Sequence, residues 1–150
     1  MQLPDDAALS DHLMVLFAQM SRAISRDGGQ LTKAEYAVVS VLDHGAPQRV
    51  SDLAGADGCD ASTVSRRVAA LADRDLVLRT PDPDDGRAHL MALTDRGRAV
   101  LHAERRRRAD LVTDALTGWG ASDRADLTRL LARLSTSLAD RATTAERTHA

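Results

Sequence analysis

The 150-residue sequence has a single cysteine and no apolar run as long as a membrane-spanning helix. Cys59 therefore cannot form an internal disulfide, which suits a reducing compartment. A membrane helix needs roughly eighteen or more successive apolar residues. The opening residues, MQLPDDAALSD, carry acids where a signal peptide carries positive charge. We therefore expect a cytoplasmic protein with no membrane partner.

Aromatic residues are also scarce, at 2% of the sequence, and comprise Phe17, Tyr36 and Trp119. Since 43% of the residues are hydrophobic, the core must consist mostly of leucine, valine and alanine. That composition favours helices. The length suits one domain or two fused lobes.

An excess of positive charge is missing as well, because the formal net charge is -2. This argues against a nonspecific, histone-like nucleic-acid binder. Between Ala61 and Ala72, however, there are two arginines and no acid. Lys33 is the only lysine among the 20 basic residues. One guanidinium group can donate two hydrogen bonds to a phosphate or to a guanine edge. The arginine excess could equally reflect a biased genome.

Helical periodicity is present at both ends of the chain. Apolar residues recur at three- and four-residue steps from Leu9 to Ile24, which predicts a first helix. Thr94 should cap a long helix whose charged middle, Glu104 to Arg108, we expect to be solvated, with an auxiliary phosphate contact as the alternative. Ser122 should cap a last helix that carries a stripe of leucines.

Capping signals predict three shorter helices between these ends. Thr32 to Glu35 form a capping box at the start of one helix. Ser51 should cap the next, which Gly58 ends, and Asp60 can cap a third. Two short helices joined by a glycine-containing turn are typical of a helix-turn-helix. The apolar runs around Val77 and from His89 to Leu93, separated by PDPDDG, predict a hairpin wing. In the helix that Asp60 caps, the inward positions are Val64, Val68 and Leu71.

The opposite face of that helix has the character of a DNA-recognition surface. With the three apolar residues turned inward, Ser62 and Arg66 point outward, Thr63 lies beside them, and Ser65 and Arg67 lie on the flanks. Short polar groups and arginine near a helix start, without bulk, suit the major groove. The alternative without a DNA-binding role is that Ser62 and Thr63 only suit the first turn of a helix, and that Arg66 and Arg67 form an ordinary solvated face.

The wing loop contains one arginine and several acids. Arg87, beside the flexible Gly86, can reach into the minor groove, whose negative potential attracts a guanidinium. The aspartates are unfavourable for DNA binding. They make sense if Asp85 pairs with an arginine and orients the wing, or if the loop is only a solvated turn.

These segments resemble the MarR family of winged helix-turn-helix transcription regulators. The resemblance rests on LTKAEYAVVSVL, SDLAGADGCDASTVSRRVAALADRDLVLR and PDPDDGRAHLMALTDRGR within residues 31–98. It implies a mainly α fold with a small β-hairpin wing, a winged helix-turn-helix with dimerisation helices at both ends. Residues 1–30 and 99–150 would form those helices around the DNA-binding lobe, residues 31–98, in one interwoven homodimer.

The resemblance also implies a function and residue roles. The function would be sequence-specific binding of a pseudo-palindromic double-stranded DNA by a repressor that a small-molecule effector releases, without a cofactor. The effector and its pocket are not identifiable from the sequence, although few aromatics suggest aliphatic walls. The implied DNA contacts are Ser62, Thr63, Ser65 and Arg66 in the groove or on phosphates, Arg67 near a phosphate, and Arg87 at the wing tip.

Other function classes have weaker support. No nucleophile-base set or glycine-rich phosphate loop indicates an enzyme, and the five histidines show no metal-ligand spacing. The alternative of a zinc-sensing member of the same family would require ligands that converge across helices. A winged helix that binds only protein would have little reason to align Arg66 with Arg87.

Cys59 stands where the family more usually has a branched aliphatic, so packing is favoured over a redox role.

Overall fold

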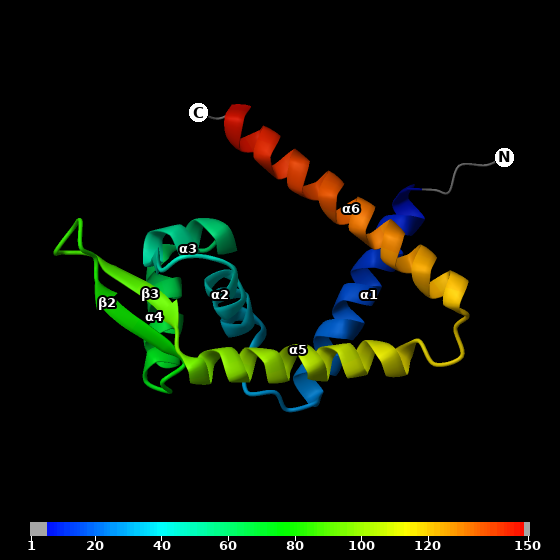
Figure 1. Cartoon of the computed structure of the whole chain (residues 1–150). Helices are drawn as coiled ribbons and strands as arrows, with labels where there is room; N and C mark the ends of the chain where they lie inside the picture. Colours follow the sequence, from blue (N-terminus) through cyan, green and yellow to red (C-terminus); the bar gives the residue numbers. More distant parts are fainter. Residues whose placement is uncertain (1–5, 149–150) are drawn as a thin grey trace. The chain divides into compact units, whose positions relative to one another are not determined.

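Within residues 6–148 the chain forms six α-helices and an antiparallel sheet of three short strands (Figure 1). The computed structural model describes the backbone of these residues and the side chains of residues 6–56 and 58–141. Residues 1–5 of the expected N-terminal region lie outside the described residues. The chain divides into two units, the first ending at Leu111 and the second beginning at Val112.

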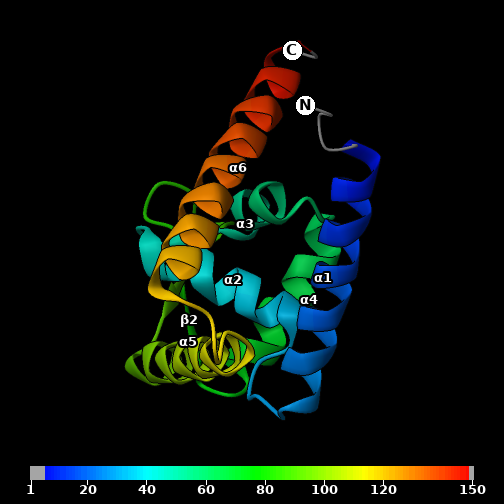
Figure 2. The same cartoon turned by 90° about the vertical axis from the view of Figure 1, so that its right-hand side faces the viewer.

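Helix α1 (Asp6–Arg26) is a single unbroken helix, as its apolar periodicity predicts (Figure 2). Helix α2 (Lys33–His44) begins with the predicted capping box. The Glu35 backbone N–H donates to Thr32 Oγ1 at 3.2 Å, and the Thr32 N–H donates to Glu35 Oε2 at 2.8 Å. Two backbone donors at the helix start are thereby satisfied.

The helix-turn-helix consists of α3 (Val50–Asp57) and α4 (Ala61–Ala72). The prediction that Ser51 caps α3 is wrong, because Arg49 is the N-cap and its backbone N–H donates to Asp52 Oδ2 at 3.2 Å. Arg49 has an extended backbone, so the helix can begin directly after it. Gly58, at φ +62°, ends α3 in the left-handed conformation that favours glycine.

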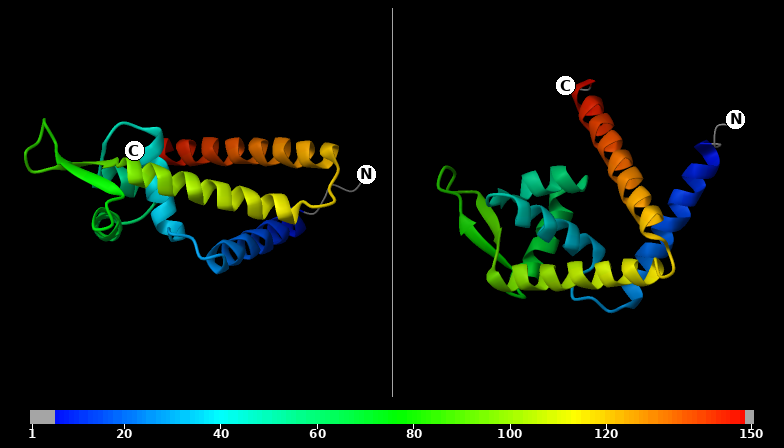
Figure 3. Two further views of the ribbon diagram at one scale, coloured as in Figure 1. Left: turned by 60° about the horizontal axis from the view of Figure 1, so that its bottom comes forward. Right: turned by 45° about the vertical axis from the view of Figure 1, so that its right-hand side comes forward.

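The sheet contains one strand more than the predicted hairpin. Strands β2 (Val77–Pro81) and β3 (His89–Leu93) form the hairpin, and Val77 pairs with Leu93. Strand β1 (Gln48–Arg49) pairs with the other edge of β3, so the strand order is β1-β3-β2. Two residues are too few for a periodic pattern, and only the pairing with β3 defines them as a strand. In both views of Figure 3 the loop between β2 and β3 projects beyond α2, α3 and α4.

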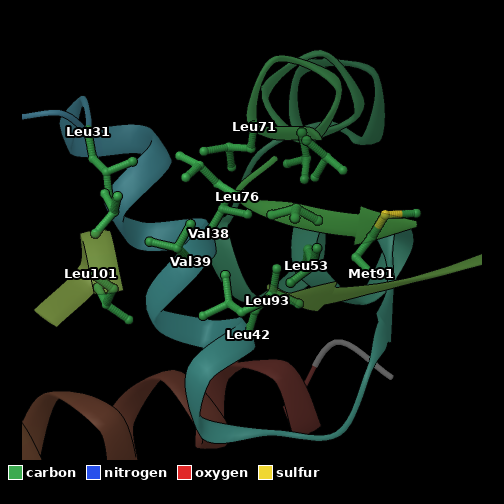
Figure 4. Packing of buried hydrophobic residues seen from close by; sticks show 14 of the residues in the cluster. Leu31, Val38, Val39, Leu42, Leu53, Leu71, Leu76, Met91, Leu93 and Leu101 are labelled. Carbon is green, nitrogen blue, oxygen red and sulfur yellow. The ribbon is translucent and has the colours of Figure 1, made fainter. Parts of the chain in front are cut away.

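The core of the winged lobe is aliphatic, as the composition predicts. Side chains from α2, α3, α4 and the sheet converge on one another in Figure 4. Full burial of one such side chain contributes about 1.5–3 kcal/mol. The buried residues of this cluster are Leu31, Val38, Val39, Leu42, Leu53, Ala54, Val64, Val68, Leu71, Leu76, Val77, Met91, Leu93, Val100 and Leu101.

Helix α5 (Asp95–Ala115) starts as predicted, with Thr94 Oγ1 accepting from the Gly97 N–H at 2.9 Å. The Thr94 hydroxyl also donates to the Asp75 carbonyl oxygen at 2.6 Å. Gly97 lies against the carbonyl of Leu76, where a β-carbon would have no room. This close approach fixes the first turn of α5 on the end of the hairpin.

The prediction that the middle of α5 is solvated is wrong. Glu104 is only 3% exposed, and its Oε1 accepts from the backbone N–H groups of Gln30 at 2.6 Å and Leu31 at 3.4 Å. Arg107 donates to Glu104 Oε2 at 2.7 Å and to Asp27 Oδ2 at 2.9 Å. Burial by itself raises the pKa of Glu104, but the hydrogen bonds from Arg107 and Gln30 outweigh it, so that pKa lies below its ordinary value.

Two other arginines of the same run also bind α2. Arg105 Nη1 lies 2.7 Å from Asp43 Oδ2, and the guanidinium carbon of Arg108 lies 3.3 Å from the ring centroid of Tyr36. Arg106 is exposed, whereas Arg105, Arg107 and Arg108 are half-buried. The charged run therefore attaches α5 to neighbouring segments, because these segments supply acids, carbonyls and a ring that the local sequence does not show.

Helix α6 (Ala121–Thr148) begins one residue before Ser122, so the prediction that this serine is the cap is wrong. The Arg124 N–H donates to the Gly120 carbonyl at 3.1 Å, which places the start of the helix at the glycine. Leu130, Leu131 and Leu138 of the predicted stripe are exposed in the single chain. In the part of the chain that the structure describes, no helix combines the length and apolar character needed to cross a membrane.

Candidate nucleic-acid interface

Helix α4 is positioned by the three inward residues that the sequence predicts. Val64, Val68 and Leu71 are buried in the core of the lobe. Because these residues lie on one side of the helix, the opposite side must face solvent. Ser62, Ser65 and Arg66 are exposed there, and Thr63 and Arg67 are half-buried at its edges. The predicted facing of all five candidate residues is therefore present in the structure.

The start of α4 is organised by the Asp60 carboxylate. Asp60 Oδ1 accepts from the Thr63 backbone N–H at 2.9 Å, which is the predicted N-cap bond. The carboxylate also accepts from the hydroxyls of Ser62 at 2.5 Å and Thr63 at 2.7 Å. These hydrogen bonds, that from Ser62 above all, hold the pKa of Asp60 far below its usual range.

This arrangement decides what the two hydroxyls can offer to a ligand. Each hydroxyl has one proton and two acceptor lone pairs. Since both protons point to Asp60, Ser62 and Thr63 present acceptors at the helix surface. They can accept from amino groups on base edges, whereas a phosphate contact would require them to release Asp60 first.

Arg66 and Arg67 differ in their surroundings. Arg66 is exposed, and within residues 6–56 and 58–141 no hydrogen bond or ion pair occupies its guanidinium. Arg67 Nη1 donates to Cys59 Sγ at 3.7 Å. Cys59 is half-buried and packs against the core, in line with the favoured packing role. Arg67 is thus held against the turn of the helix-turn-helix, and Arg66 extends into solvent.

The orientation of the wing depends on an aspartate that the sequence did not single out. Asp82 is 6% exposed and lies 2.6 Å from Nη2 and 2.7 Å from Nε of Arg49. Its Oδ1 also accepts from the Asp84 N–H at 2.9 Å. The Asp84 hydrogen bond and Arg49 lower the pKa of Asp82 despite its burial. The sequence offers little indication that Asp82 pairs with Arg49, because Arg49 lies 33 positions earlier on β1, a strand that the sequence did not predict.

The predicted wing residues lie next to this ion pair. Asp85 Oδ2 is 3.9 Å from Arg49 Nη1, so Asp85 approaches the same guanidinium less closely than Asp82 does. Asp85 Oδ1 accepts from the Arg87 backbone N–H at 3.1 Å. This bond shapes the loop tip on which Arg87 is exposed. The orienting role of Asp85 itself stays a prediction.

A second feature lies between α1, the α1–α2 loop and α5. A cavity of about 380 Å³ is bordered by apolar side chains, among them Phe17, Met20 and Ile24, and by Lys33 and Arg108. Phe17 contributes an aromatic ring to the otherwise largely aliphatic apolar wall of this cavity. Among the described residues, Nε and Nη2 of Arg108 are buried without a hydrogen-bond partner, and Nε lies 3.9 Å from Glu104 Oε2. Within the same residues, no group of three His, Cys, Asp or Glu side chains could hold a metal ion.

The comparison with known proteins decides the family. A model of the MarR family matches residues 31–89. An uncharacterised HTH-type transcriptional regulator of Bacillus subtilis, YxaD, is 33% identical over 112 residues, which cover 75% of this chain and 78% of that protein. The chain belongs to the MarR family. The winged helix-turn-helix fold that the sequence predicts is that of a family of transcriptional regulators, not of enzymes.

Two solved MarR-like structures extend the likeness over most of the chain. The PcaV transcriptional regulator from Streptomyces coelicolor, in complex with its natural ligand, is 26% identical with a TM-score of 0.65, covering 92% of this chain and 99% of that one. The transcriptional repressor CouR, bound to a 23-mer DNA duplex, is 29% identical with a TM-score of 0.64, covering 85% and 89%.

Proposed function

We propose that this MarR-family protein represses transcription by binding a specific, pseudo-palindromic double-stranded DNA through α4 and the wing. The observation that carries the proposal is the outward face of α4, where Ser65 and Arg66 are exposed while Val64 and Val68 are buried. The major groove of B-DNA admits an α-helix whose outer face lacks bulky side chains. The DNA duplex bound to the related repressor CouR supports the choice of ligand.

The residue roles follow from donors and acceptors on this face. Arg66 donates to a base edge, and the hydroxyls of Ser62 and Thr63, whose protons Asp60 holds, accept from amino groups on bases. Ser65 and Arg67 contact the edges of the groove or its phosphates. At the wing tip Arg87 enters the minor groove, and Asp85 helps Arg49 to orient the loop.

The proposed active form is a homodimer in the cytoplasm. Leu9, Met14 and Phe17 on α1 are exposed in the single chain, as are Leu131 and Leu138 on α6. Apolar residues at this density require a partner, and a closed two-fold dimer is the commonest solution. We assign dimerisation to residues 1–30 and 99–150, and DNA binding to residues 31–98. The two copies of α4 then enter successive major grooves roughly 34–36 Å apart.

A small-molecule effector in the cavity beside α1 releases the DNA in this proposal. The buried donors of Arg108 and the ammonium of Lys33 favour a ligand with an acidic group, and Phe17 and Ile24 favour an apolar body. A ligand at this place changes the spacing of the two winged lobes, so that both can no longer bind together. The natural ligand bound to the related regulator PcaV supports this regulation.

The experiment that tests DNA binding is a mobility-shift titration with the protein's own upstream DNA and with random duplex, over rising salt. Wild type should prefer its operator, with a steep salt dependence. Arg66→Ala should lose about 1–3 kcal/mol of operator affinity and relax sequence preference at one position per half-site. Arg106→Ala, which also removes an exposed guanidinium but from α5, is the matched control and should bind as wild type.

Two outcomes of this titration would contradict the proposal. If wild type binds operator and random duplex equally, sequence-specific recognition is wrong. If Arg66→Ala retains full affinity and preference, the assignment of the α4 face is wrong. In the same assay, small carboxylic acids should release the operator from wild type but not from Arg108→Gln; release from both proteins would place the effector elsewhere.

A further inference from the structure

A basic groove lies between the start of α3 and the strands of the wing. It is lined by Arg49, Ser51, Arg79, Arg87 and His89, with Val50 and Met91 among its apolar members. The groove brings together three guanidinium groups from β1, β2 and the wing loop, far apart in sequence. None of the residue roles proposed above uses Arg79, Ser51 or His89.

The arginines of this groove differ in whether an acid neutralises them. Arg49 is paired with Asp82 at 2.6 Å and approached by Asp85 at 3.9 Å. Arg79 and Arg87 have no carboxylate partner within residues 6–56 and 58–141. The neighbour of Arg79 is His89, whose Nδ1 lies 3.3 Å from Arg79 Nη2. Arg79 and Arg87 are therefore left without an ion pair, and the groove keeps a net positive charge when both aspartates beside Arg49 are counted.

Such a groove is complementary to an anion with several acceptor oxygens. A guanidinium presents five N–H donors in a planar fork that matches phosphate geometry. His89 Nδ1, where it accepts from Nη2, occupies one of those donors and leaves the remaining ones of Arg79 to a ligand. The Ser51 hydroxyl at the start of α3 lies at the same groove and donates to Asp52 Oδ1 at 3.5 Å, a long hydrogen bond that it can exchange for a ligand oxygen.

We propose that this groove binds one phosphate of the DNA backbone, with Arg79 and Ser51 as donors, next to the place where Arg87 enters the minor groove. The inference rests on the proposed DNA binding and adds a contact to it. Phosphate is favoured over a base edge because the groove lies beside the wing loop and not on the face of α4. Backbone phosphates border the minor groove into which the wing reaches.

A phosphate contact has a signature that a base contact lacks. It weakens operator and random duplex alike, and each lost contact reduces the slope of log affinity against log salt by about 0.9. Arg79→Ala removes one contact per subunit, so the slope for a dimer should fall by about 1.8. Between about 50 and 200 mM salt, wild-type binding should therefore weaken about twelvefold more than Arg79→Ala binding.

The experiment measures fluorescence anisotropy of labelled operator and random duplex over this salt range. Arg79→Lys keeps the charge without the fork and should retain most of the slope but bind more weakly than wild type. Arg106→Ala is the charge-matched control and should keep the wild-type slope. Thermal unfolding of each variant checks that the exposed substitutions leave the fold intact. Inorganic phosphate at matched ionic strength should compete only weakly, because the site holds a single phosphate.

The outcomes separate this inference from the proposed function. If wild type binds its operator with a steep slope and Arg79→Ala has the same slope, the groove does not contact DNA, and only this inference fails. If wild type binds no duplex, the proposed function and this inference fail together. If polyglutamate binds wild type as tightly as DNA does, and Arg79→Ala removes that binding, the groove is assigned to an acidic protein partner instead.

Discussion

At the residue scale, Asp60 determines both how α4 begins and what its first turn can recognise. Its carboxylate accepts one backbone N–H and two hydroxyl protons. The sequence predicts the cap, because aspartate is favoured before the first turn of a helix. It does not predict that both hydroxyls donate to the same carboxylate. Whether these hydroxyls act as donors or acceptors in the proposed recognition surface is therefore a property of the folded turn.

The depressed pKa of Asp60 leads to a prediction on stability at low pH. Because the folded pKa lies below the unfolded value of about 3.9, the ionised cap stabilises the fold above that pH. This contribution is lost as the pH falls below about 4 towards the folded pKa. Asp60→Ala should therefore lower Tm at pH 7, and the difference from wild type should shrink below about pH 4.

The measurement is a series of thermal melts of wild type, Asp60→Ala and Asp60→Asn from neutral pH to about pH 3. Asp60→Asn keeps a good N-cap acceptor without the charge, so its Tm should lie between the other two at pH 7. A Tm difference between wild type and Asp60→Ala that stays constant down to the lowest pH would show that ionisation of Asp60 contributes nothing.

At the scale of elements, α5 is attached to the segment between α1 and α2 by its charged middle. Glu104 accepts two backbone N–H groups of that segment, and Arg107 binds Glu104, Asp27 and the carbonyl of Ile24. Gly29 lies so close to Arg107 and Glu104 that a β-carbon would collide with both. Polar contacts therefore hold the α1–α2 loop against α5. The periodicity of the sequence does not predict these contacts, because it shows only that this part of α5 is charged.

Adjacent arginines on α5 provide a test of this attachment. Arg107→Ala leaves Glu104 buried without its cationic partner and should lower the free energy of unfolding by roughly 1–3 kcal/mol. Arg106→Ala removes an exposed guanidinium and should change it by less than about 0.5 kcal/mol. Urea unfolding of both variants measures the difference. Equal stabilities would mean that the network around Glu104 adds nothing to the fold.

At the scale of the whole molecule, the exposed apolar residues of α1 and α6 are the basis of the proposed dimer. Leu131 is 42% exposed and Leu138 is 59% exposed in the single chain. The dimer is central to the proposed function, since two linked lobes gain affinity from binding one duplex together. Each lobe alone would offer a single recognition helix.

A charge on the leucine stripe should separate the subunits. Leu131→Asp buries a carboxylate in the proposed interface and should convert the dimer to a chain of 16.1 kDa. Thr136→Asp places the same charge on the opposite side of α6 and should remain dimeric. Light scattering after size-exclusion chromatography measures the mass, and a mobility shift measures the loss of operator binding. A wild-type protein that is monomeric would contradict the dimer directly.

The amino-acid sequence by itself determined the features that depend on neighbouring residues. The helices, the capping box at Thr32, the Asp60 cap and the inward set Val64, Val68 and Leu71 follow from local hydrogen bonding and periodicity. The hairpin wing and the exposed position of Arg87 follow from the turn residues between two apolar runs, and the family resemblance added the expected homodimer. These features account for most of the fold and for the facing of α4.

Only the tertiary structure decided the contacts between residues distant in the chain. Strand β1 exists because β3 supplies its partner, and Arg49 meets Asp82 because that pairing brings them together. The arginines of α5 are bound because α2 and the preceding loop supply their partners. A charged residue carries no local sign of whether it will meet water or a partner, because its environment is created only when the chain folds.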